Sequence, residues 1–377
     1  MKLALPITMF TVSMFFMGCK MSNNQEKTYN DMREDSLVFI SGSYSSAGEE
    51  GIKVFTFDES NAGFTYKSGV KGVSNPSFLS ELTGNNILYS VAECDTDDSF
   101  LYSMKYNPDS MNLVVIGCDK TNGAAPCFVM ADWKGNKVFT ANYSGGSISV
   151  FKIDSTGNVV REKNICFNGK GVHMTRQEAP HIHSVYMSPD STKLWICDLG
   201  TDRIRVVDMP ALSHDEADDI LLPDGSGPRH MCFHSSGKYA YVITELSGDV
   251  VVLGIKEDNK VDIIQTVKAD TLGGEGSADI HLSPDEKFLY ASCRIKGDGI
   301  AVFSVSSQTG KVTRVGYCPT GKHPRNFAIT PNGNYILVAC RDENAIEIYE
   351  VNKETGMLKD TGKRIYTKAP VCVRWIL

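Results

Sequence analysis

The chain has 377 residues, of which 42% are hydrophobic, and a formal net charge of −7. A nucleic-acid-binding protein would present a basic surface, so this charge argues against nucleic acid as a partner. The length exceeds that of one ordinary compact domain. An array of repeats is the exception, because its core grows one repeat at a time.

Residues 1–19 have the pattern of a secretory signal peptide. Lys2 supplies the positive start, and the apolar stretch 3–17 is too short to span a membrane. The end of this stretch, Phe16-Met17-Gly18-Cys19, resembles the lipobox of bacterial lipoproteins, with Phe16 where leucine is usual. We therefore predict lipidation at Cys19, with an ordinary cleaved signal as the alternative. The lipid would be the only link to a membrane and would place the protein in the cell envelope, in the periplasm or on the outer surface.

A polar stretch, residues 20–35, follows without hydrophobic periodicity and is predicted to be a flexible tether. From residue 36 to 377, short segments rich in Val, Ile, Phe and Tyr alternate with turns of Gly, Asp, Asn and Ser. This pattern is typical of β-strands. No long stretch has a helical period, and the acidic segment 211–220 is predicted to be a loop turn. The domain is therefore expected to be all-β.

One unit recurs along the domain. The segments Gly227-Pro228-Arg229-His230 and Lys322-His323-Pro324-Arg325-Asn326 are each followed by a turn and then by an apolar run. Equivalent segments recur about every 50 residues, a period found in propeller blades. Seven residues mark the copies: Ser77, Cys127, His183, Arg229, Ala278, Arg325 and Val371. With four strands counted in a copy, the sequence predicts a seven-bladed β-propeller with four-stranded blades.

The two ends of the domain complement each other. The seventh copy contains only a first strand, residues 371–376, whereas residues 37–67 supply a second, a third and a fourth strand. We therefore expect both termini to build the last blade, which would leave no open sheet edge. Ten cysteines follow Cys19, but Cys197, Cys293 and Cys340 occupy one repeated position, which indicates small buried residues rather than disulfides.

Equivalent positions in a propeller form rings around the channel. The first-strand ring holds the seven residues above, and the second strands end near Glu93, Asn142, Asp198, Glu245, Arg294 and Arg341. Repeats that only pack would carry similar residues there, so the variety indicates a functional site. Neutralising ion pairs in a solvated channel are the alternative.

The residue types suggest acid–base chemistry on an anion. His183, with His181 on the same strand face, offers a general base, although a structural hydrogen bond is an alternative for each. Arginines such as Arg229, Arg294 and Arg325 bind phosphate or carboxylate well. A calcium site on the oxygen donors Glu93, Asn142, Asp198 and Glu245 is a further alternative. The arginines of the same ring argue against it, so no metal and no cofactor are expected.

Together, several motifs resemble the seven-bladed propeller lactonases over roughly residues 36–377. These motifs are His181-Ile182-His183-Ser184, Gly227–His230 with Thr244-Glu245-Leu246, Ala278–Asp285 with Tyr290–Arg294, and His323–Phe327. The family includes the bacterial propeller-type 6-phosphogluconolactonase and the fungal carboxymuconate lactonizing enzyme. The resemblance implies that His183, Arg229, Glu245 and Arg294 are catalytic. We assign substrate contacts to Arg325, His181, Asn142, Asp198 and Asn326. Cys340-Arg341 departs from the neutral pair expected there.

The function that the resemblance implies is hydrolysis of a sugar-acid lactone, above all 6-phospho-D-glucono-1,5-lactone to 6-phosphogluconate. The partner would be a small anionic lactone or sugar acid, and the protein a monomer or weak dimer. The exported N-terminus departs from the family's cytoplasmic metabolic members, whose location is the alternative. Two other functions stay open: a cycloisomerase acting on muconate-type acids, and a non-catalytic envelope propeller that binds a glycan or a protein.

Overall fold

The structure is a computed structural model that describes residues 36–377, except for residues 97–98, 133–136 and 258–259. The predicted signal peptide, the lipidation site Cys19 and the tether lie outside the described residues. In the described part of the chain, no helix is long and apolar enough to cross a membrane.

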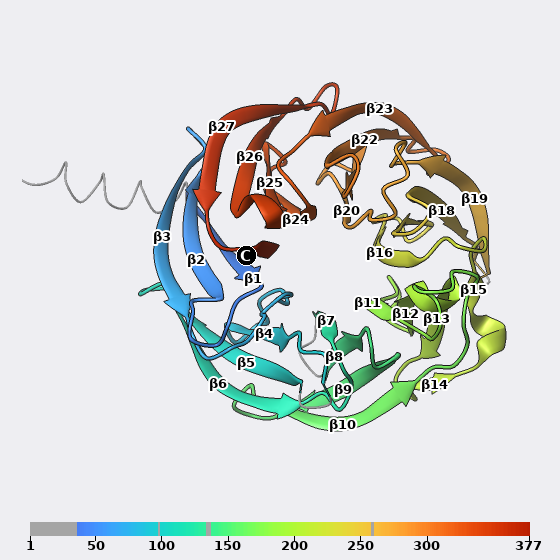
Figure 1. Ribbon diagram of the computed structural model, residues 1–377, viewed down its shortest axis with the longest axis horizontal. Helices are drawn as coiled ribbons and strands as arrows, with labels where there is room; N and C mark the ends of the chain where they lie inside the picture. Colours follow the sequence, from blue (N-terminus) through green and yellow to red (C-terminus); the bar gives the residue numbers. More distant parts are fainter. Residues whose placement is uncertain (1–35, 97–98, 133–136, 258–259) are drawn as a thin grey trace, which may run out of the picture. The chain divides into compact units, whose positions relative to one another are not determined.

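Seven antiparallel sheets stand around a central channel, as the sequence predicts (Figure 1). From the channel outward, the blades consist of β28 (Pro370–Ile376), β1 (Ser36–Ser43), β2 (Ile52–Asp58) and β3 (Gly63–Val70); β4 (Ile87–Ala92), β5 (Phe100–Asn107) and β6 (Asn112–Lys120); β7 (Pro126–Ala131), β8 (Lys137–Asn142), β9 (Ser147–Ile153) and β10 (Val159–Cys166); β11 (Ile182–Met187), β12 (Lys193–Asp198), β13 (Arg203–Asp208), β14 (Ser213–His214) and β15 (Ile220–Leu221); β16 (Pro228–Phe233), β17 (Tyr239–Thr244), β18 (Asp249–Ile255) and β19 (Val261–Lys268); β20 (Ile280–Leu282), β21 (Phe288–Cys293), β22 (Gly299–Val305) and β23 (Val312–Pro319); β24 (Pro324–Ile329), β25 (Tyr335–Cys340), β26 (Ala345–Val351) and β27 (Leu358–Tyr366).

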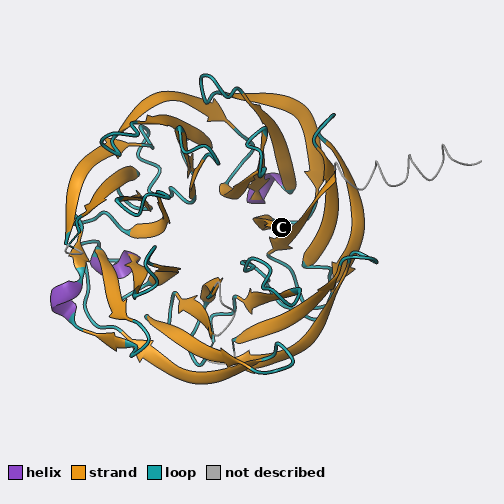
Figure 2. Cartoon of the chain, turned by 180° about the vertical axis from the view of Figure 1, so that it is seen from behind, coloured by secondary structure: helices purple, strands orange, loops and turns teal. Residues whose placement is uncertain are grey.

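Two blades depart from the regular pattern. In the blade of β4, the innermost segment is not a regular strand and forms only isolated bridges with β4, Leu79 with Ser90 and Thr83 with Ile87. In the blade of β11, the outermost strand is broken into β14 and β15 by the short 3-10 helix η2 (Glu216–Asp218). The acidic segment 211–220 spans this break and holds no strand longer than two residues. Figure 2 shows how little helix the propeller contains.

The ring closes where the two ends of the domain meet. Strand β28 pairs antiparallel with β1, with Val38 opposite Ile376 and Ser41 opposite Val373. The last blade is therefore built from both termini, as expected. Because β1 has β2 on its other side, this pairing leaves no unpaired strand edge at the join.

Apolar side chains fill the space between neighbouring blades, and a repeated tyrosine bond links three pairs of them. Tyr89, Tyr241 and Tyr290 lie at equivalent places in second strands and are fully buried. Each hydroxyl donates to a glycine carbonyl in the next blade, at Gly157, Gly310 and Gly356 respectively. Cys197, Cys293 and Cys340 are also fully buried, as their shared position predicts.

Closure can be tested by placing a charge in the joining strand. Val373 is fully buried and packs with Phe39 and Leu337, so Val373→Asp would bury an unpaired carboxylate. We expect a loss of about 4 kcal/mol or more in the free energy of unfolding, measured in urea. The control Tyr366→Asp changes a side chain that is 81% exposed, and it should stay within about 0.5 kcal/mol of the parent. Equal stability of the two variants would contradict this account.

Candidate active site

The predicted site residues gather at one end of the channel. Inner strands start at this end and second strands finish at it, because the two strands run antiparallel in each blade. The inner strands β11, β16 and β24 each contain a β-bulge here, and the extra residue is His183, Arg229 or Arg325. Cys127 takes the same place in β7. A bulge turns the extra side chain away from the regular alternation of the strand. In each of these four blades, the extra residue therefore lies at the mouth.

Glu245 is the centre of the mouth. Its Oε2 accepts a hydrogen bond of 2.8 Å from Arg229 Nε and lies 3.2 Å from Arg294 Nη2. Its Oε1 lies 2.5 Å from Arg176 Nη2. One carboxylate thus holds three guanidinium groups that come from three separate parts of the chain. The structure brings together the predicted residues Arg229, Glu245 and Arg294.

The electrostatics of this cluster follow from burial and charge. Burial alone would raise the pKa of the Glu245 carboxyl, but Arg294, Arg229 and Arg176 outweigh it and lower that pKa to about 2. The pKa of Arg294 is lowered to about 9, because burial and the nearby Arg229, Arg325 and Arg341 outweigh the attraction of Glu245. Glu245 is therefore ionised at neutral pH, and cations are in surplus around it.

His183 lies beside this cluster and is buried, with 4% of its surface exposed. Its ring centroid lies 5.2 Å from that of His230, whose Nε2 is 3.4 Å from Arg229 Nη1. Burial, Arg229, His230 and Arg325 hold the pKa of the His183 imidazole well below its usual range. The ring is therefore neutral at pH 7, which is the form that accepts a proton.

His181 flanks the same mouth. Its ring stacks on Tyr143, with centroids 4.5 Å apart, and its Nδ1 lies 3.1 Å from the Tyr143 carbonyl oxygen. Its Nε2 lies 3.4 Å from Glu178. Arg325 lies on another wall, with its guanidinium over the ring of Tyr44 and Nη2 3.8 Å from Glu93 Oε1.

Three residues predicted to touch substrate are instead engaged within the fold. Asn142 is fully buried and its amide bonds Ser147 and Ser149. Asp198 is fully buried; it caps the 3-10 helix η1 (Leu199–Thr201) and accepts from Arg205 Nε at 3.0 Å. Asn326 joins two blades by donating to Asp279 and accepting from the Val373 N–H. None of the three is retained in the proposed site, because internal partners already occupy these side chains.

Sequence reasoning missed a histidine–aspartate pair in the channel. His230 Nδ1 lies 2.7 Å from Asp279 Oδ1, and His281 Nε2 lies 2.9 Å from the other carboxylate oxygen. His230 and Asp279 stand inside the motifs that suggested the family, one place after Arg229 and Ala278, so the signal was present. The bulge at Arg229 explains the omission, because it lets consecutive residues occupy the channel.

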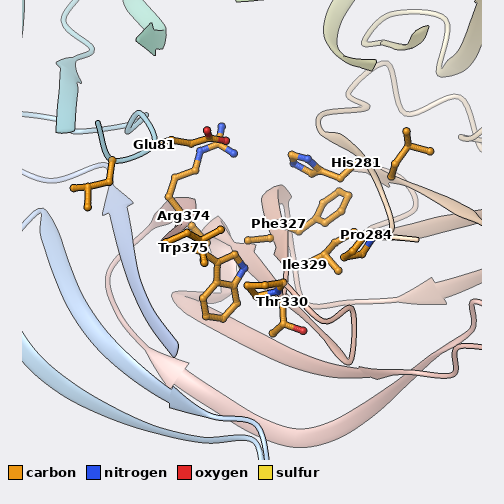
Figure 3. A pocket seen from close by; sticks show the side chains of 14 residues that line it. Glu81, His281, Pro284, Phe327, Ile329, Thr330, Arg374 and Trp375 are labelled. Atoms are coloured by element: carbon orange, nitrogen blue, oxygen red, sulfur yellow. The ribbon is translucent and has the colours of Figure 1, made fainter. Parts of the chain in front are cut away.

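Aromatic rings fill the channel below the mouth. Phe78 stacks on Phe128, with ring centroids 4.2 Å apart, and both rings meet the edge of His230. Beyond these rings, towards the other end, lies a cavity of about 270 Å³ (Figure 3). In that view Arg374 and Glu81 lie on one side of the cavity and His281 on the other.

Three further residues at the mouth had not been assigned from the sequence. Arg176 reaches Glu245 from the loop before β11, and Tyr44 follows β1; neither occupies a repeated position. His323 lies between Arg294 and Arg341, with ring nitrogens 3.0 and 3.2 Å from their guanidinium groups. It directly precedes Pro324 in a recognised motif, which was the available signal.

In the described residues, the oxygen donors considered for a calcium site are not arranged to bind one ion. Glu245 is bound to arginines, Asp198 to Arg205, and Glu93 accepts from the Tyr44 hydroxyl at 2.9 Å. In the part of the chain that the structure describes, no group of three or more His, Cys, Asp or Glu side chains is arranged to hold a metal ion.

The ten cysteines there are free thiols.

The structure is thus a seven-bladed propeller. At one opening of its channel, arginines form ion pairs with a glutamate beside a neutral histidine. Residues 38–375 match the model of the lactonase, 7-bladed beta-propeller family, and the chain belongs to this family. The resemblance seen in the sequence motifs is thereby confirmed. A 6-phosphogluconolactonase of Formosa agariphila is 36% identical over 319 residues, which cover 82% of this chain and 90% of that protein. The 6-phosphogluconolactonase of Bacillus subtilis is 30% identical and covers 89% and 97%.

Solved structures give the same result. A candidate 6-phosphogluconolactonase of Bacteroides fragilis superposes with a TM-score of 0.87 at 40% identity, covering 91% of this chain and 98% of the other. The periplasmic gluconolactonase of Pseudomonas aeruginosa superposes with a TM-score of 0.84 at 27% identity, covering 91% and 99%. The relatives thus match the whole propeller rather than a few of its blades.

The central role of Glu245 can be tested by removing its charge. Glu245→Gln would leave three guanidinium groups without their counter-charge, so we expect a loss of about 3–5 kcal/mol in unfolding free energy at pH 7. Because folding lowers the pKa of Glu245 to about 2, its stabilisation is present above the ordinary pKa and fades as the pH falls towards 2. The stability difference between parent and variant, measured in urea from pH 7 to pH 3, should narrow. A constant difference would contradict the assignment.

Proposed function

We propose that this chain hydrolyses a sugar-acid lactone that carries an anionic group, above all 6-phospho-D-glucono-1,5-lactone. The observation that carries the proposal is the surplus of guanidinium groups beside a neutral buried imidazole. Such a mouth attracts an anion and offers it a base. The names of the relatives, 6-phosphogluconolactonase and gluconolactonase, support the same substrate class.

In the proposed reaction, His183 takes a proton from water while the water oxygen bonds to the lactone carbonyl carbon. The ring is neutral at pH 7 and can therefore accept a proton. The cations that lower its pKa make it a weak base, and the negative charge of a bound anionic substrate offsets their effect. The carbonyl oxygen gains negative charge, and the Arg229 and Arg294 guanidinium groups stabilise it. The ester bond to the ring oxygen then breaks, and the proton passes from the imidazole to that oxygen, which becomes a hydroxyl. The product is an open-chain sugar acid with a free carboxylate.

Glu245 acts in this scheme as a positioning residue for the arginines. An ionised carboxylate that already accepts from three guanidinium groups is poorly suited to take a further proton, and its low pKa agrees with that. Arg325 and His181 line the same mouth and would contact the sugar. Arg325 is fixed by Tyr44 and Glu93, so its guanidinium is held in place before the substrate arrives.

The cellular place is proposed from the sequence. Residues 1–19 would direct export, Cys19 would carry the lipid, residues 20–35 would tether the propeller of residues 36–377, and the protein would act in the envelope. The similar propeller of Pseudomonas aeruginosa is named a periplasmic gluconolactonase, which supports a place outside the cytoplasm.

The substrate is tested by comparing two lactones. The purified propeller is given 6-phosphogluconolactone or unphosphorylated gluconolactone at one concentration, and acid release is corrected for spontaneous ring opening. We expect faster turnover of the phosphorylated compound. A muconate-type acid is included, since formation of a lactone from it would identify a cycloisomerase. If no lactone is hydrolysed and a glycan raises the thermal stability of the protein, the protein is a binding protein instead.

His183 is tested by removing its basicity without removing its bulk. His183→Gln should lower kcat/KM by about a hundredfold or more, the usual contribution of a general base. The matched control His234→Gln alters a histidine in the turn after β16, outside the mouth, and should keep the parental rate. Thermal unfolding of each variant checks that it is folded. A fully active, folded His183→Gln protein would contradict the mechanism.

The pH profile follows from the environment of His183. An unperturbed histidine would lose half of its neutral form at about pH 6.5. Because the pKa of His183 lies well below that value, the imidazole stays neutral as the pH falls. We expect the acid limb of log kcat/KM to lie clearly below pH 6.5. Arg325→Gln removes one of the cations that disfavour the protonated ring, so its limb should move to higher pH even though its rate falls. A limb at or above pH 6.5 in the parent protein would count against His183.

A further inference from the structure

Arg341 stands at the rim of the mouth, on the far side of His323 from Arg294. It opens the 3-10 helix η3 (Arg341–Glu343), directly after the second strand β25. Its Nη2 lies 3.2 Å from His323 Nδ1, and His323 Nε2 lies 3.0 Å from Arg294 Nη1. One imidazole therefore separates two guanidinium groups, one buried and one partly exposed.

His323 is held in this place at a conformational cost. Its φ is 61°, in the left-handed region that non-glycine residues seldom adopt. Its N–H donates to Asp298 Oδ1 at 2.9 Å, and its carbonyl accepts from the Arg341 N–H at 3.0 Å. The equivalent residues before the inner-strand prolines, Asn75, Ala125, Gly227 and Ala369, also have positive φ, so this conformation belongs to the repeat.

The imidazole adds no charge of its own. Burial, Arg294 and Arg341 lower the pKa of His323 to about 3, so the ring is neutral at physiological pH. A neutral ring has one acceptor nitrogen, so it accepts a hydrogen bond either from Arg294 at Nε2 or from Arg341 at Nδ1. Arg294 also donates to Gly276 and Ser277 and pairs with Glu245. Arg341 uses Nε and Nη2 in its bonds to Asp342 and His323, which leaves Nη1 for a ligand.

The charges of the mouth do not cancel. Five arginines take part in its ion pairs, namely Arg176, Arg229, Arg294, Arg325 and Arg341. Three carboxylates pair with them, namely Glu93, Glu245 and Asp342, and Glu178 and Asp298 lie beside His181 and His323. The ion pairs themselves contain more guanidinium groups than carboxylates, which suits a phosphate monoester that carries about −1.5 to −2 at pH 7.

We propose that Arg341, which His323 separates from the catalytic Arg294, binds the phosphoryl group of the substrate and selects phosphorylated over unphosphorylated lactones. This inference rests on the proposed function and deepens it by naming the group that is recognised. Arg341 is a specificity residue in this account: it holds the far end of the sugar, while Arg229, Arg294 and His183 face the lactone carbonyl. A guanidinium can bind two oxygens of a phosphoryl group in paired hydrogen bonds.

The test is a change of substrate preference. Arg341→Gln keeps a polar side chain of moderate length and removes the charge. A hydrogen bond to a charged group contributes about 1.5–3 kcal/mol, so the ratio of kcat/KM for 6-phosphogluconolactone to that for gluconolactone should fall about tenfold to a hundredfold. The loss should appear mainly in KM. The control Arg314→Gln alters an arginine of the outer strand β23 and should keep the parental ratio. An unchanged ratio in Arg341→Gln would overturn the proposal.

A binding measurement separates failure of this subsite from failure of the proposed function. Calorimetric titration with 6-phosphogluconate and with gluconate needs no turnover. The parent protein should bind 6-phosphogluconate more tightly, and Arg341→Gln should lose that advantage. If no lactone is hydrolysed but the difference persists, the proposed function fails and the subsite stands. If lactones are hydrolysed but the parent protein binds the two acids equally, the subsite fails and the lactonase stands.

Discussion

The pairing of β28 with β1 is the constraint on which the rest of the propeller depends. Without it the sheet edges of the first and last blades would be exposed, and the inner strands would have no fixed axis. The same join also builds part of the site. Tyr44 follows β1 directly, and its N–H donates to Ala369 just before β28. Its hydroxyl holds Glu93 and its ring lies against Arg325. Closing the ring therefore fixes one wall of the mouth.

A second constraint is the bulge that recurs at the start of the inner strands. At Arg229 it allows two consecutive side chains to work in the channel: Arg229 reaches Glu245, and His230 reaches Asp279. A regular strand would send one of the two away from the axis. Proline precedes the bulged residue in β7, β16 and β24, which suits the first position of a strand, where no ladder N–H is needed. The Pro-Arg pairs of the repeat therefore mark the positions of these bulges in the sequence.

The sequence was sufficient for the architecture, since alternating strands, a period near 50 residues and complementary termini leave few other folds. It located Arg229, Glu245 and Arg294 because repeat position fixes where the backbone lies and these side chains are long enough to meet. It did not foresee the internal bonds of Asn142 and Asp198, which occupy equivalent positions but carry short side chains that bond within their own blades. Arg176 and Tyr44 come from connections outside the repeat, so periodicity carried no information about them.

The charge balance of the mouth links stability to function. Burying guanidinium groups in surplus over carboxylates costs free energy, and the lowered pKa of Arg294 expresses that cost. One more acidic residue at the mouth would lower this free-energy cost, and its absence is consistent with a functional role for the arginines. Below the mouth, Phe78 and Phe128 stack and Phe128 meets His230, so aromatic rings rather than carboxylates lie on that side of the arginines. An anion bound at the mouth would supply negative charge and meet donors already in place. Repulsion among the arginines destabilises the empty site, and the same repulsion should favour the binding of an anion. The substrate would then complete the network of ion pairs at the mouth.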